Sequence, residues 1–401
     1  MRHPLVLGIE TSCDDTACAV LDGAGRVLSS VVSSQLAAHR PYGGVVPEIA
    51  SREHLANWLP VSAEALAAAG AAVADLDVIA ATRGPGLVGA LLVGLSLGKA
   101  LAYALERPFH AVHHLEGHIY SAFLQAGTGA AAAPAEAPPE RFLALVLSGG
   151  HSALYAADTG GGGGGGVATL GETRDDAFGE AFDKVGKRLG LPYPQGPRVD
   201  QLAELGDPGG LRLPVPECGD TLDFSYSGLK SRTLTEIERL ERKLGPLDGG
   251  DGRGGGVGSG GGAGTQGDPG ESGAGGDPPR PVLDLLAAFR AAAVAQVFDR
   301  LERLLARAIT PKWPRRPLLA VSGGAAANRL LRRELPPWCA RHGVELRLVP
   351  LIHAGDNAAM IAHAALLRHR RGQADDPFAA EAESRIPIEQ AGQAGRPAEP
   401  A

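Results

Sequence analysis

Short apolar runs alternate with longer amphipathic segments along the first hundred residues. Short apolar runs bounded by polar or glycine turns are typical of strands, whereas longer periodic segments are typical of helices. We therefore expect a helix over residues 50–69 and a second, apolar helix from Leu87 to Leu105. Strands are expected at residues 4–10, 17–21, 27–33 and 76–82. This alternation predicts the α/β class.

The second half of the chain repeats the opening pattern. Arg141–Leu147 predicts a strand, residues 148–152 a small polar turn, and residues 153–157 a second strand. A further apolar run followed by a glycine turn spans Leu318 to Gly324. Two halves that each open on a strand, a turn and a strand facing a cleft indicate a duplicated α/β domain.

Low-complexity segments suggest where the domains divide. Segments dominated by glycine, alanine or proline bury too little apolar surface to offset the entropy of ordering. They are residues 127–140, 160–166, 245–281 and the tail beyond Gly372. We predict an N-terminal lobe over residues 1–126, a linker at 127–140, a C-terminal lobe over 141–372 with a disordered insertion at 245–281, and a flexible tail at 373–401.

Composition and charge exclude several classes of protein. With 401 residues and 44% hydrophobic side chains, the chain can bury a sizeable core, so it is not wholly disordered. A net charge of −7 argues against nucleic-acid binding by bulk charge, but not against a local basic patch. The four cysteines include no Cys-x-x-Cys pair, which excludes a zinc ribbon. The N-terminus lacks the apolar core of a signal peptide, and Lys99 interrupts the longest apolar stretch. We therefore expect a buried helix there and a cytoplasmic protein without a membrane span.

The sharpest motif is the histidine pair His114 and His118 in the segment His-Leu-Glu-Gly-His. Residues four apart share one face of a helix, so both imidazoles can bind one metal ion. Zincin metalloproteases place their general-base glutamate directly after the first histidine; Leu115 occupies that position here, which disfavours a protease. The alternative is a histidine pair without a ligand role. Asp356 is a candidate third ligand or, alternatively, the N-cap of the helix that follows it.

Two serine–glycine–glycine turns follow apolar strands, at Ser148–Ser152 and Ser322–Asn328. Backbone amides in such turns can donate to phosphate oxygens, which favours a nucleotide site; plain tight turns are the alternative. Neither is a P-loop, because Gly-Lys-Ser/Thr does not occur in the sequence. Gly84–Gly89 formally matches the dinucleotide pattern G-x-G-x-x-G, but Pro85 removes an amide donor. Close packing of a helix on a strand is the favoured explanation of those glycines.

Acidic and basic side chains gather at a few places. Asp14 and Asp15 lie in the first polar turn. Residues 171–188 predict a helix whose acids, Asp183 among them, also fit a solvated face with lysines at helical spacing. Asp200 is expected to begin another helix. The arginine clusters fit phosphate contacts or exposed helix faces, and they lie at residues 315–316, 329–333 and 368–371.

Together these motifs resemble the bacterial TsaD family of tRNA N6-adenosine threonylcarbamoyltransferases. The resemblance covers residues 5 to about 370 in the family's order and leaves out the low-complexity segments. It departs from the family pattern at Gln195, where glycine is usual, and at Gly355, where threonine is common. The motifs are Gly8–Thr16, Tyr42–His54, Arg83–Gly86, His114–His118, Ser148–His151, Gly179–Lys184, Phe224–Lys230, Ser322–Asn328 and Asp356–Met360.

The resemblance implies the two-lobed fold shared by actin, hexokinase and the heat-shock chaperone ATPases, called the ASKHA fold, with duplicated α/β domains and a nucleotide cleft between them. It implies transfer of a threonylcarbamoyl group from threonylcarbamoyl-AMP to N6 of the adenosine beside the anticodon (position 37), with release of AMP, in tRNAs that read codons beginning with A. It also implies one divalent metal, iron(II) or alternatively zinc, on His114, His118 and Asp356. The implied partners are tRNA, a TsaB-like paralogue and a TsaE-like ATPase. A net charge of −7 agrees with a tRNA site that is shared with such partners.

The chemistry of the implied reaction suggests roles for residues around the turns. Amides at Gly149 and Gly150 can stabilise charge that develops on the donor. Asp14 or Asp15 can accept the N6 proton, and the residues do not decide between them; Glu10 is a further candidate catalytic carboxylate. Adenylate contacts are implied for Val146, Leu147, Ser148, Gly149, Gly150, Asp183, Gly196, Asp200 and Asn328.

Other functions stay open on the residues alone. A phosphotransferase of the same superfold needs the acids and the glycine turns but not the histidine pair. A metalloprotease needs the histidines but a differently placed glutamate. A non-catalytic scaffold would have no use for an intact set of His114, His118 and Asp356.

Overall fold

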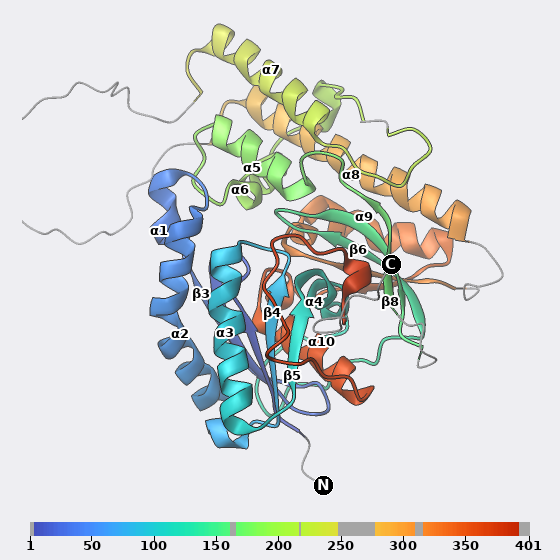
Figure 1. Cartoon of the computed structure of the whole chain (residues 1–401). Helices are drawn as coiled ribbons and strands as arrows, with labels where there is room; N and C mark the ends of the chain where they lie inside the picture. Colours follow the sequence, from blue (N-terminus) through green and yellow to red (C-terminus); the bar gives the residue numbers. More distant parts are fainter. Residues whose placement is uncertain (1–3, 161–165, 216–217, 248–276, 309–315, 393–401) are drawn as a thin grey trace, which may run out of the picture.

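The computed structural model describes residues 4–160, 166–215, 218–247, 277–308 and 316–392. These residues form two five-stranded sheets with helices around and between them (Figure 1). The first sheet contains β1 (Val6–Glu10), β2 (Asp15–Leu21), β3 (Val27–Ser34), β4 (Val78–Gly84) and β5 (Phe109–His113). The second contains β6 (Arg141–Leu147), β7 (Ser152–Asp158), β8 (Gly166–Glu172), β9 (Leu318–Ser322) and β10 (Glu345–Leu348). The helices are α1 (Leu36–His39), α2 (Pro47–Ala69), α3 (Val88–Leu105), α4 (His114–Ser121), α5 (Phe178–Arg188), α6 (Gln195–Ala203), α7 (Ser227–Leu244), α8 (Arg280–Ala308), α9 (Arg329–His342) and α10 (Ala358–Arg370).

The two sheets share one topology. In the first sheet the order is β3-β2-β1-β4-β5, with β1 antiparallel to β2 and parallel to β4. In the second sheet β6 takes the place of β1: the order is β8-β7-β6-β9-β10, with β6 antiparallel to β7 and parallel to β9. The predicted two-lobed α/β fold with duplicated domains is confirmed. The β1–β2 turn and the β6–β7 turn therefore occupy equivalent places in the two lobes.

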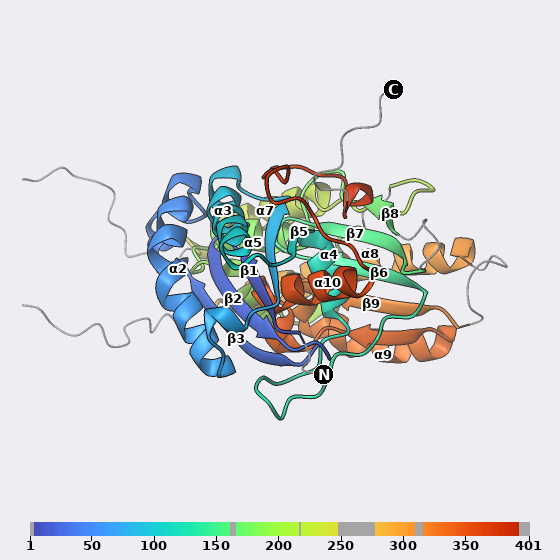
Figure 2. The ribbon, with the colours of Figure 1, turned by 60° about the horizontal axis from the view of Figure 1, so that its bottom comes forward.

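Within the described residues, three hydrophobic cores join the layers of sheets and helices, whose arrangement Figure 2 shows. The first core lies between the outer face of the first sheet and helices α2 and α3, and it includes Ile9 and Ile79. The outer core of the second lobe joins its sheet to α5, α6, α8 and α9, and includes Phe182 and Phe289. Between the sheets lie α4 and α10, in a third core that draws side chains from both sheets.

The last helix, α10, packs on the first sheet although its residues fall in the range predicted for the C-terminal lobe. It is buried from Ala358 to Arg368 and contacts β1, β2 and β4. Close approach depends on Gly8 of β1: a Cβ at that position would lie 2.3 Å from the carbonyl oxygen of Ala358. The N-terminal lobe is therefore completed by the distant end of the chain.

Two predicted helices begin elsewhere than expected. The helix predicted over residues 171–188 begins at Phe178, because Gly171 still pairs with β7 and a Cβ there would lie 2.4 Å from the backbone of Leu222. The helix expected to begin at Asp200 begins at Gln195, so Gly196 and Asp200 both lie within α6. The helix after residue 84 begins at Val88, one residue after the predicted Leu87, and a Cβ on Gly86 would lie 2.5 Å from the carbonyl oxygen of Ser12. That contact agrees with a packing role for this glycine.

The low-complexity segments differ in their outcomes. Residues 127–140 contain no helix or strand, but Gly129 and Glu136 donate backbone hydrogen bonds to Val27 and Phe123. In the glycine run, Gly166 begins β8 and residues 161–165 lie outside the described residues. In the predicted insertion, residues 248–276 lie outside the described residues, and α8 already begins at Arg280.

The C-terminal segment was expected to fray, yet residues 373–392 lie against the first lobe. We call this segment the strap. Asp375, Ala380 and Ile386 are buried, and Asp375 accepts a hydrogen bond from the backbone of Ala111 in β5. The expectation failed because the strap buries scattered apolar side chains and pairs its main chain with distant strands, which composition does not reveal. Residues 393–401 lie outside the described residues.

Among the described residues, two helices, Val88–Leu105 and the segment 280–307, are long and apolar enough to cross a membrane by length and composition alone. The second is 72% buried in the C-terminal lobe, as a core helix is. The first is only 39% buried, so the expectation of a buried helix is met on one face only. Its outer face exposes Leu92 to 50% and Val88 to 44%.

Candidate active site and metal centre

The candidate site lies in a cleft between the lobes, where the turns that follow β1 and β6 meet. One cavity of about 780 Å³ is lined by Asp14, Asp15 and His114 from the first lobe and by the β6–β7 turn from the second. A second cavity, of about 360 Å³, adjoins it and lies mainly between α5, α6 and the turn before α9. The two cavities share Gly149 and Asp183, so one ligand could extend through both.

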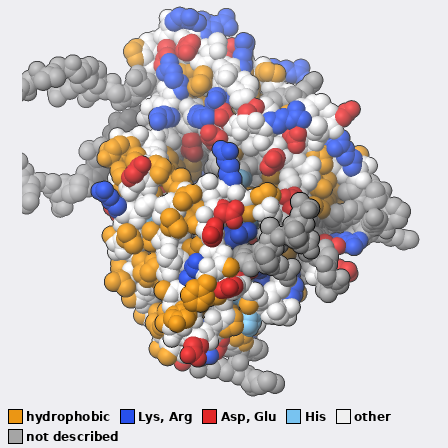
Figure 3. Space-filling model, in the orientation of Figure 1, with side chains coloured by type: hydrophobic (Ala, Val, Ile, Leu, Met, Phe, Trp, Pro, Cys, Tyr) orange, Lys and Arg blue, Asp and Glu red, His pale blue; other side chains and the backbone are white. Residues whose placement is uncertain are grey.

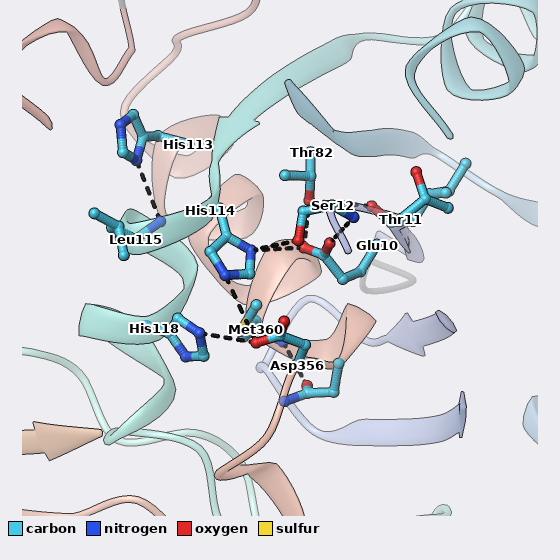
Figure 4. A network of polar contacts seen from close by, with 12 residues as sticks. Glu10, Thr11, Ser12, Thr82, His113, His114, Leu115, His118, Asp356 and Met360 are labelled. Carbon is cyan, nitrogen blue, oxygen red and sulfur yellow. Dashed lines mark hydrogen bonds and ion pairs between the residues drawn. The ribbon is translucent and has the colours of Figure 1, made fainter. Parts of the chain in front are cut away.

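The histidine pair and Asp356 come together at the floor of the cleft, as the sequence predicts. His114 and His118 lie one turn apart on the buried helix α4 and both point toward Asp356, which precedes α10 (Figure 4). Asp356 Oδ1 lies 3.1 Å from His118 Nε2 and 3.6 Å from His114 Nε2. The possible ligand atoms of the three residues all lie within 4.8 Å of one another. The alternative role for Asp356 is taken by its neighbour, because Asn357 accepts the capping bond from the Met360 amide.

A buried carboxylate holds His114 in its orientation. Glu10 Oε2 lies 3.1 Å from His114 Nδ1, and Ser12 Oγ lies 3.2 Å from the same nitrogen (Figure 4). Glu10 in turn accepts bonds from Thr82 Oγ1 at 2.6 Å and from the Ser12 amide at 2.5 Å. Glu10 is 1% exposed and does not line the cleft. Its expected role as a catalytic carboxylate does not fit this place, which suits it to orient His114 instead.

Two carboxylates and two imidazoles share this buried region. Burial lowers the pKa of His114, but Asp356 and Glu10 outweigh it and raise that pKa to about 9. Burial raises the pKa of Asp356, yet the adjacent His114 and His118 outweigh burial and hold it well below its usual range. Burial also opposes ionisation of Glu10, whose pKa His114 nevertheless lowers. The site therefore favours an added positive charge, which can be a proton or a metal ion.

The residues fit a divalent metal. Two imidazoles and one carboxylate are the donor set that suits non-haem iron(II) or zinc, and three protein ligands leave positions for substrate. The Glu10 bond to Nδ1 of His114 leaves Nε2 facing Asp356, which is how carboxylates commonly orient metal-binding histidines. The carboxylates of Glu10 and Asp356 beside the two imidazoles also favour a bound cation.

The helix that carries both histidines begins with a cap made by His113. Its Nδ1 accepts a hydrogen bond from the Leu115 amide at 3.2 Å. Glu116 lies three residues after this cap, in the first turn of α4. Glu116 is buried, and the pKa of its carboxyl is raised by that burial.

Five of the predicted adenylate contacts line the smaller cavity together. Asp183 Oδ1 accepts the Gly196 amide at 2.6 Å, which ties α5 to α6. Asp200 Oδ1 accepts Asn328 Nδ2 at 2.8 Å, and Asn328 also caps α9 through the Leu331 amide. Burial raises the pKa of Asp183 against the bonds that it accepts. Gly149 lines the same cavity from the opposite turn.

The β6–β7 turn presents its backbone to both cavities. Gly149 and Gly150 are exposed at the cleft, and Ser148 Oγ accepts the amide of His151 at 3.0 Å, which holds the turn closed. Val146 and Leu147 are fully buried in β6 and neither lines a cavity, so they support the turn from behind. The second glycine turn lies beside it, since a Cβ on Gly323 would lie 2.2 Å from the Leu147 carbonyl oxygen.

The acids of the β1–β2 turn face the larger cavity. Asp14 Oδ2 accepts a bond from Tyr193 Oη at 3.2 Å across the cleft. Burial, opposed by a bond from Ser34 and aided by the adjacent Asp14, raises the pKa of Asp15 to about 7. Asp15 is therefore half-protonated near neutrality, whereas an ordinary aspartate is fully ionised.

Sequence reasoning missed several residues of the cleft. His151 lies within the serine–glycine–glycine motif and lines the larger cavity; burial first, and then His114 and His118, lower its pKa to about 4. Lys187 bridges the lobes by donating to the Gly43 carbonyl at 3.0 Å. Phe178 and Phe182 stack in α5 along the smaller cavity, and their spacing of four residues was a usable signal. The bridging lysine had no local signal, because its partner is far away in the sequence.

The arginine clusters are structural in part. Arg368 is buried and pairs with Asp375 of the strap at 2.8 Å, so it is not available to phosphate. Arg332 donates to backbone carbonyls of Ala326 and Val349. Arg329 lines the smaller cavity. Residue 315 lies outside the described residues.

The chain is similar over most of its length to tRNA-modifying transferases. The family model described as TsaD, tRNA N6-adenosine threonylcarbamoyltransferase, matches residues 26–363. A protein of that name from Pelobacter propionicus is 45% identical over 359 residues, which cover 89% of this chain and 90% of the relative. One from Sorangium cellulosum is 42% identical over 373 residues, covering 92% and 93%. Among solved structures, full-length HypF in its phosphate- and nucleotide-bound form aligns with 92% of this chain and 56% of its own, with a TM-score of 0.51 and 11% identity, a likeness of fold alone.

Proposed function

This chain belongs to the tRNA N6-adenosine threonylcarbamoyltransferase family and is a tRNA-modifying transferase, and from that premise we propose its donor, acceptor and site. The donor is threonylcarbamoyl-AMP, and the acceptor is N6 of the adenosine beside the anticodon, position 37, in tRNAs that read codons beginning with A. The observation that carries the proposal is a cleft that joins a nucleotide-sized cavity to the cluster of His114, His118 and Asp356.

The reaction is an acyl transfer. The N6 amine attacks the carbonyl carbon of the mixed anhydride, a new N–C bond forms, and the bond from that carbon to the phosphate-bridging oxygen breaks. AMP leaves with that oxygen and its electron pair, and N6 loses one proton. Adenine N6 is a weak nucleophile, so holding the two substrates in line contributes more than a strong base would.

Within this cleft, the smaller cavity is the proposed AMP site. Asp183, Gly196, Asp200 and Asn328 line one wall, and Gly149 faces them. Exposed amides of Gly149 and Gly150 are placed to donate to the phosphate and to charge that develops on the leaving oxygen. The reactive carbonyl then lies toward the larger cavity and the histidine pair.

Asp15 is the proposed acceptor of the N6 proton. It lines the larger cavity, and its pKa of about 7 makes it a better base near neutrality than an ordinary aspartate. Asp14, beside it, is held by Tyr193 and is the alternative acceptor.

The proposed cofactor is one divalent metal on His114, His118 and Asp356, with iron(II) as the first choice and zinc as the alternative. When bound, such a metal supplies Lewis-acid polarisation of a carbonyl or phosphate oxygen. The chain's own part is to hold the three ligands in place, through Glu10 and Ser12 behind His114 and through the capped start of α4.

We also propose a TsaB-like paralogue and a TsaE-like ATPase as partners in the cytoplasm. Support comes from an exposed apolar surface on α2 and α3, where Leu55 and Leu59 are 64% and 73% exposed (Figure 3). Apolar patches of this kind commonly mark protein interfaces. The net charge of −7 also favours a tRNA site that a partner helps to form.

The test is nucleoside mass spectrometry on unmodified tRNA incubated with threonylcarbamoyl-AMP, this protein and its proposed partners. We expect threonylcarbamoyladenosine with the wild type and a loss of at least a hundredfold with His114→Ala. Retained activity in the variant would remove the histidine cluster from the proposal. ATP turnover without a modified nucleoside would favour the phosphotransferase alternative.

A further inference from the structure

The strap contacts the first lobe at two points next to the candidate site, at His113 and at Gly86. The Ile386 carbonyl lies 3.0 Å from His113 Nε2, directly before the first metal-ligand candidate. The Ser384 carbonyl accepts the Gly86 amide at 3.3 Å, in the loop between β4 and α3 that lines the larger cavity. Both contacts are made by main-chain oxygens, so they depend on where the strap runs rather than on its side chains.

The first contact leads to α4 through one side chain. His113 Nδ1 accepts the Leu115 amide, so this nitrogen carries no proton and the N–H is on Nε2, which donates to Ile386. One imidazole is thus held at both ends. It fixes the direction of the first turn of the helix on which His114 and His118 stand.

The second contact leads to His114 through the backbone. The Leu87 amide, next to the strap-bound Gly86, donates to the Ser12 carbonyl at 2.8 Å. Ser12 Oγ then lies 3.2 Å from His114 Nδ1. The two routes start two residues apart on the strap and converge on one imidazole.

The strap is itself anchored tightly. Arg83, with a side chain 6% exposed, binds Glu383 at 3.1 Å, and the Glu383 amide donates to the Arg83 carbonyl at 2.9 Å. A Cβ on Gly84 would lie 2.1 Å from the Glu383 carbonyl oxygen, so the strap lies directly on β4. Farther along, Glu389 accepts the Thr169 amide of β8 at 2.9 Å, which connects the strap to the second lobe.

We propose that the strap is a positioning element of the histidine cluster: the carbonyls of Ile386 and Ser384 set the direction of His114 and thereby the affinity of the site for a metal. The inference rests on the proposed metal site. It assigns positioning roles to His113 and Glu383, neither of which is a proposed ligand or substrate contact. Groups that orient metal ligands typically change affinity by 10- to 100-fold.

The test is Co²⁺ binding to the full chain, followed by visible absorption, with Glu383→Lys and a matched control. The lysine would face the buried Arg83 and displace the strap there. Glu345→Lys makes the same charge change at a similarly exposed glutamate, which pairs with Arg347 on β10. We expect Glu383→Lys to raise the Co²⁺ Kd about tenfold and to alter the absorption bands at saturation, and the control to stay within twofold.

A second variant keeps the proposal falsifiable if Glu383→Lys does not fold. His113→Asn keeps a good helix N-cap but is too short to hold the Ile386 carbonyl as well. We expect a similar tenfold loss of Co²⁺ affinity, with far-UV circular dichroism unchanged. A wild-type Kd in the folded variants would overturn the strap proposal. His114→Ala binding Co²⁺ as tightly as wild type would instead overturn the metal site itself.

Discussion

Gly8→Ala tests how closely α10 must approach β1 for the site to form. The added Cβ would lie 2.3 Å from the carbonyl oxygen of Ala358 and 2.9 Å from the Ala362 amide. Both are backbone atoms of α10, so no side chain can turn away to make room. Since an ordinary contact needs about 3.4 Å, we expect the start of α10 to shift by roughly 1 Å, at a cost of about 1–3 kcal/mol for overpacking.

The shift reaches the histidine cluster because Asp356 lies two residues before α10. Metal sites tolerate ligand displacements of only about 0.2 Å, so a displacement of roughly 1 Å should cost at least tenfold in affinity. Differential scanning fluorimetry would measure stability and a Co²⁺ titration would measure binding. Gly210→Ala is the control, because its Cβ would meet nothing nearer than 4.0 Å. Unchanged Co²⁺ affinity in Gly8→Ala would refute the idea that α10 packing sets the position of Asp356.

Three further predictions address other parts of the cleft. The pKa of Asp15 is raised to about 7, so its basic form is lost as the pH falls below 7, and single-turnover rates should fall with it. The Asp15→Asn variant should lose that pH dependence and should be about 10²–10⁴-fold slower. Asn328→Ala removes the α9 cap and a partner of Asp200, so calorimetry should show weaker AMP binding, and stability should fall by about 1 kcal/mol. Arg368→Met leaves the buried Asp375 carboxylate unpaired and should cost about 3–5 kcal/mol in urea unfolding, part of which Asp375→Asn should restore in the double variant.

The sequence predicts the features of this protein that are local. Strand–turn–strand units, the spacing of His114 and His118 on one helix face, and the two glycine turns are each set within a few residues, and the structure contains all of them. The residues alone left Asp356 as either a third ligand or a helix cap, because 238 residues separate it from His118, and the resemblance implied the ligand role. The metal itself stays a prediction.

Features set by contacts between distant segments were not predictable. Glu10 is buried behind His114 because Thr82 and helix α4 pack around it. The pattern of polar and apolar residues along its strand therefore did not indicate that Glu10 faces away from the cleft. The strap has the composition of a frayed tail, but contacts with distant segments hold it, among them its main-chain bonds with Arg83 and His113 and its ion pairs with Arg83 and Arg368. The pattern of polar and apolar side chains in a sequence does not reveal contacts that are made by main-chain carbonyls.

The position of α10 has a consequence for synthesis of the protein. At about 5–20 residues per second, a ribosome needs roughly 20–70 s to pass from β1 to α10. During that time the inner face of the first sheet has no α10 to cover it, because Val6, Ala17 and Val78 share their core with this helix. The nascent N-terminal lobe therefore exposes apolar surface that a chaperone would bind, and Asp356 joins the two histidines only when almost the whole chain has left the ribosome. A premature stop before residue 356 would leave a lobe that is both open and without its carboxylate, so partly made chains cannot assemble the three-residue cluster.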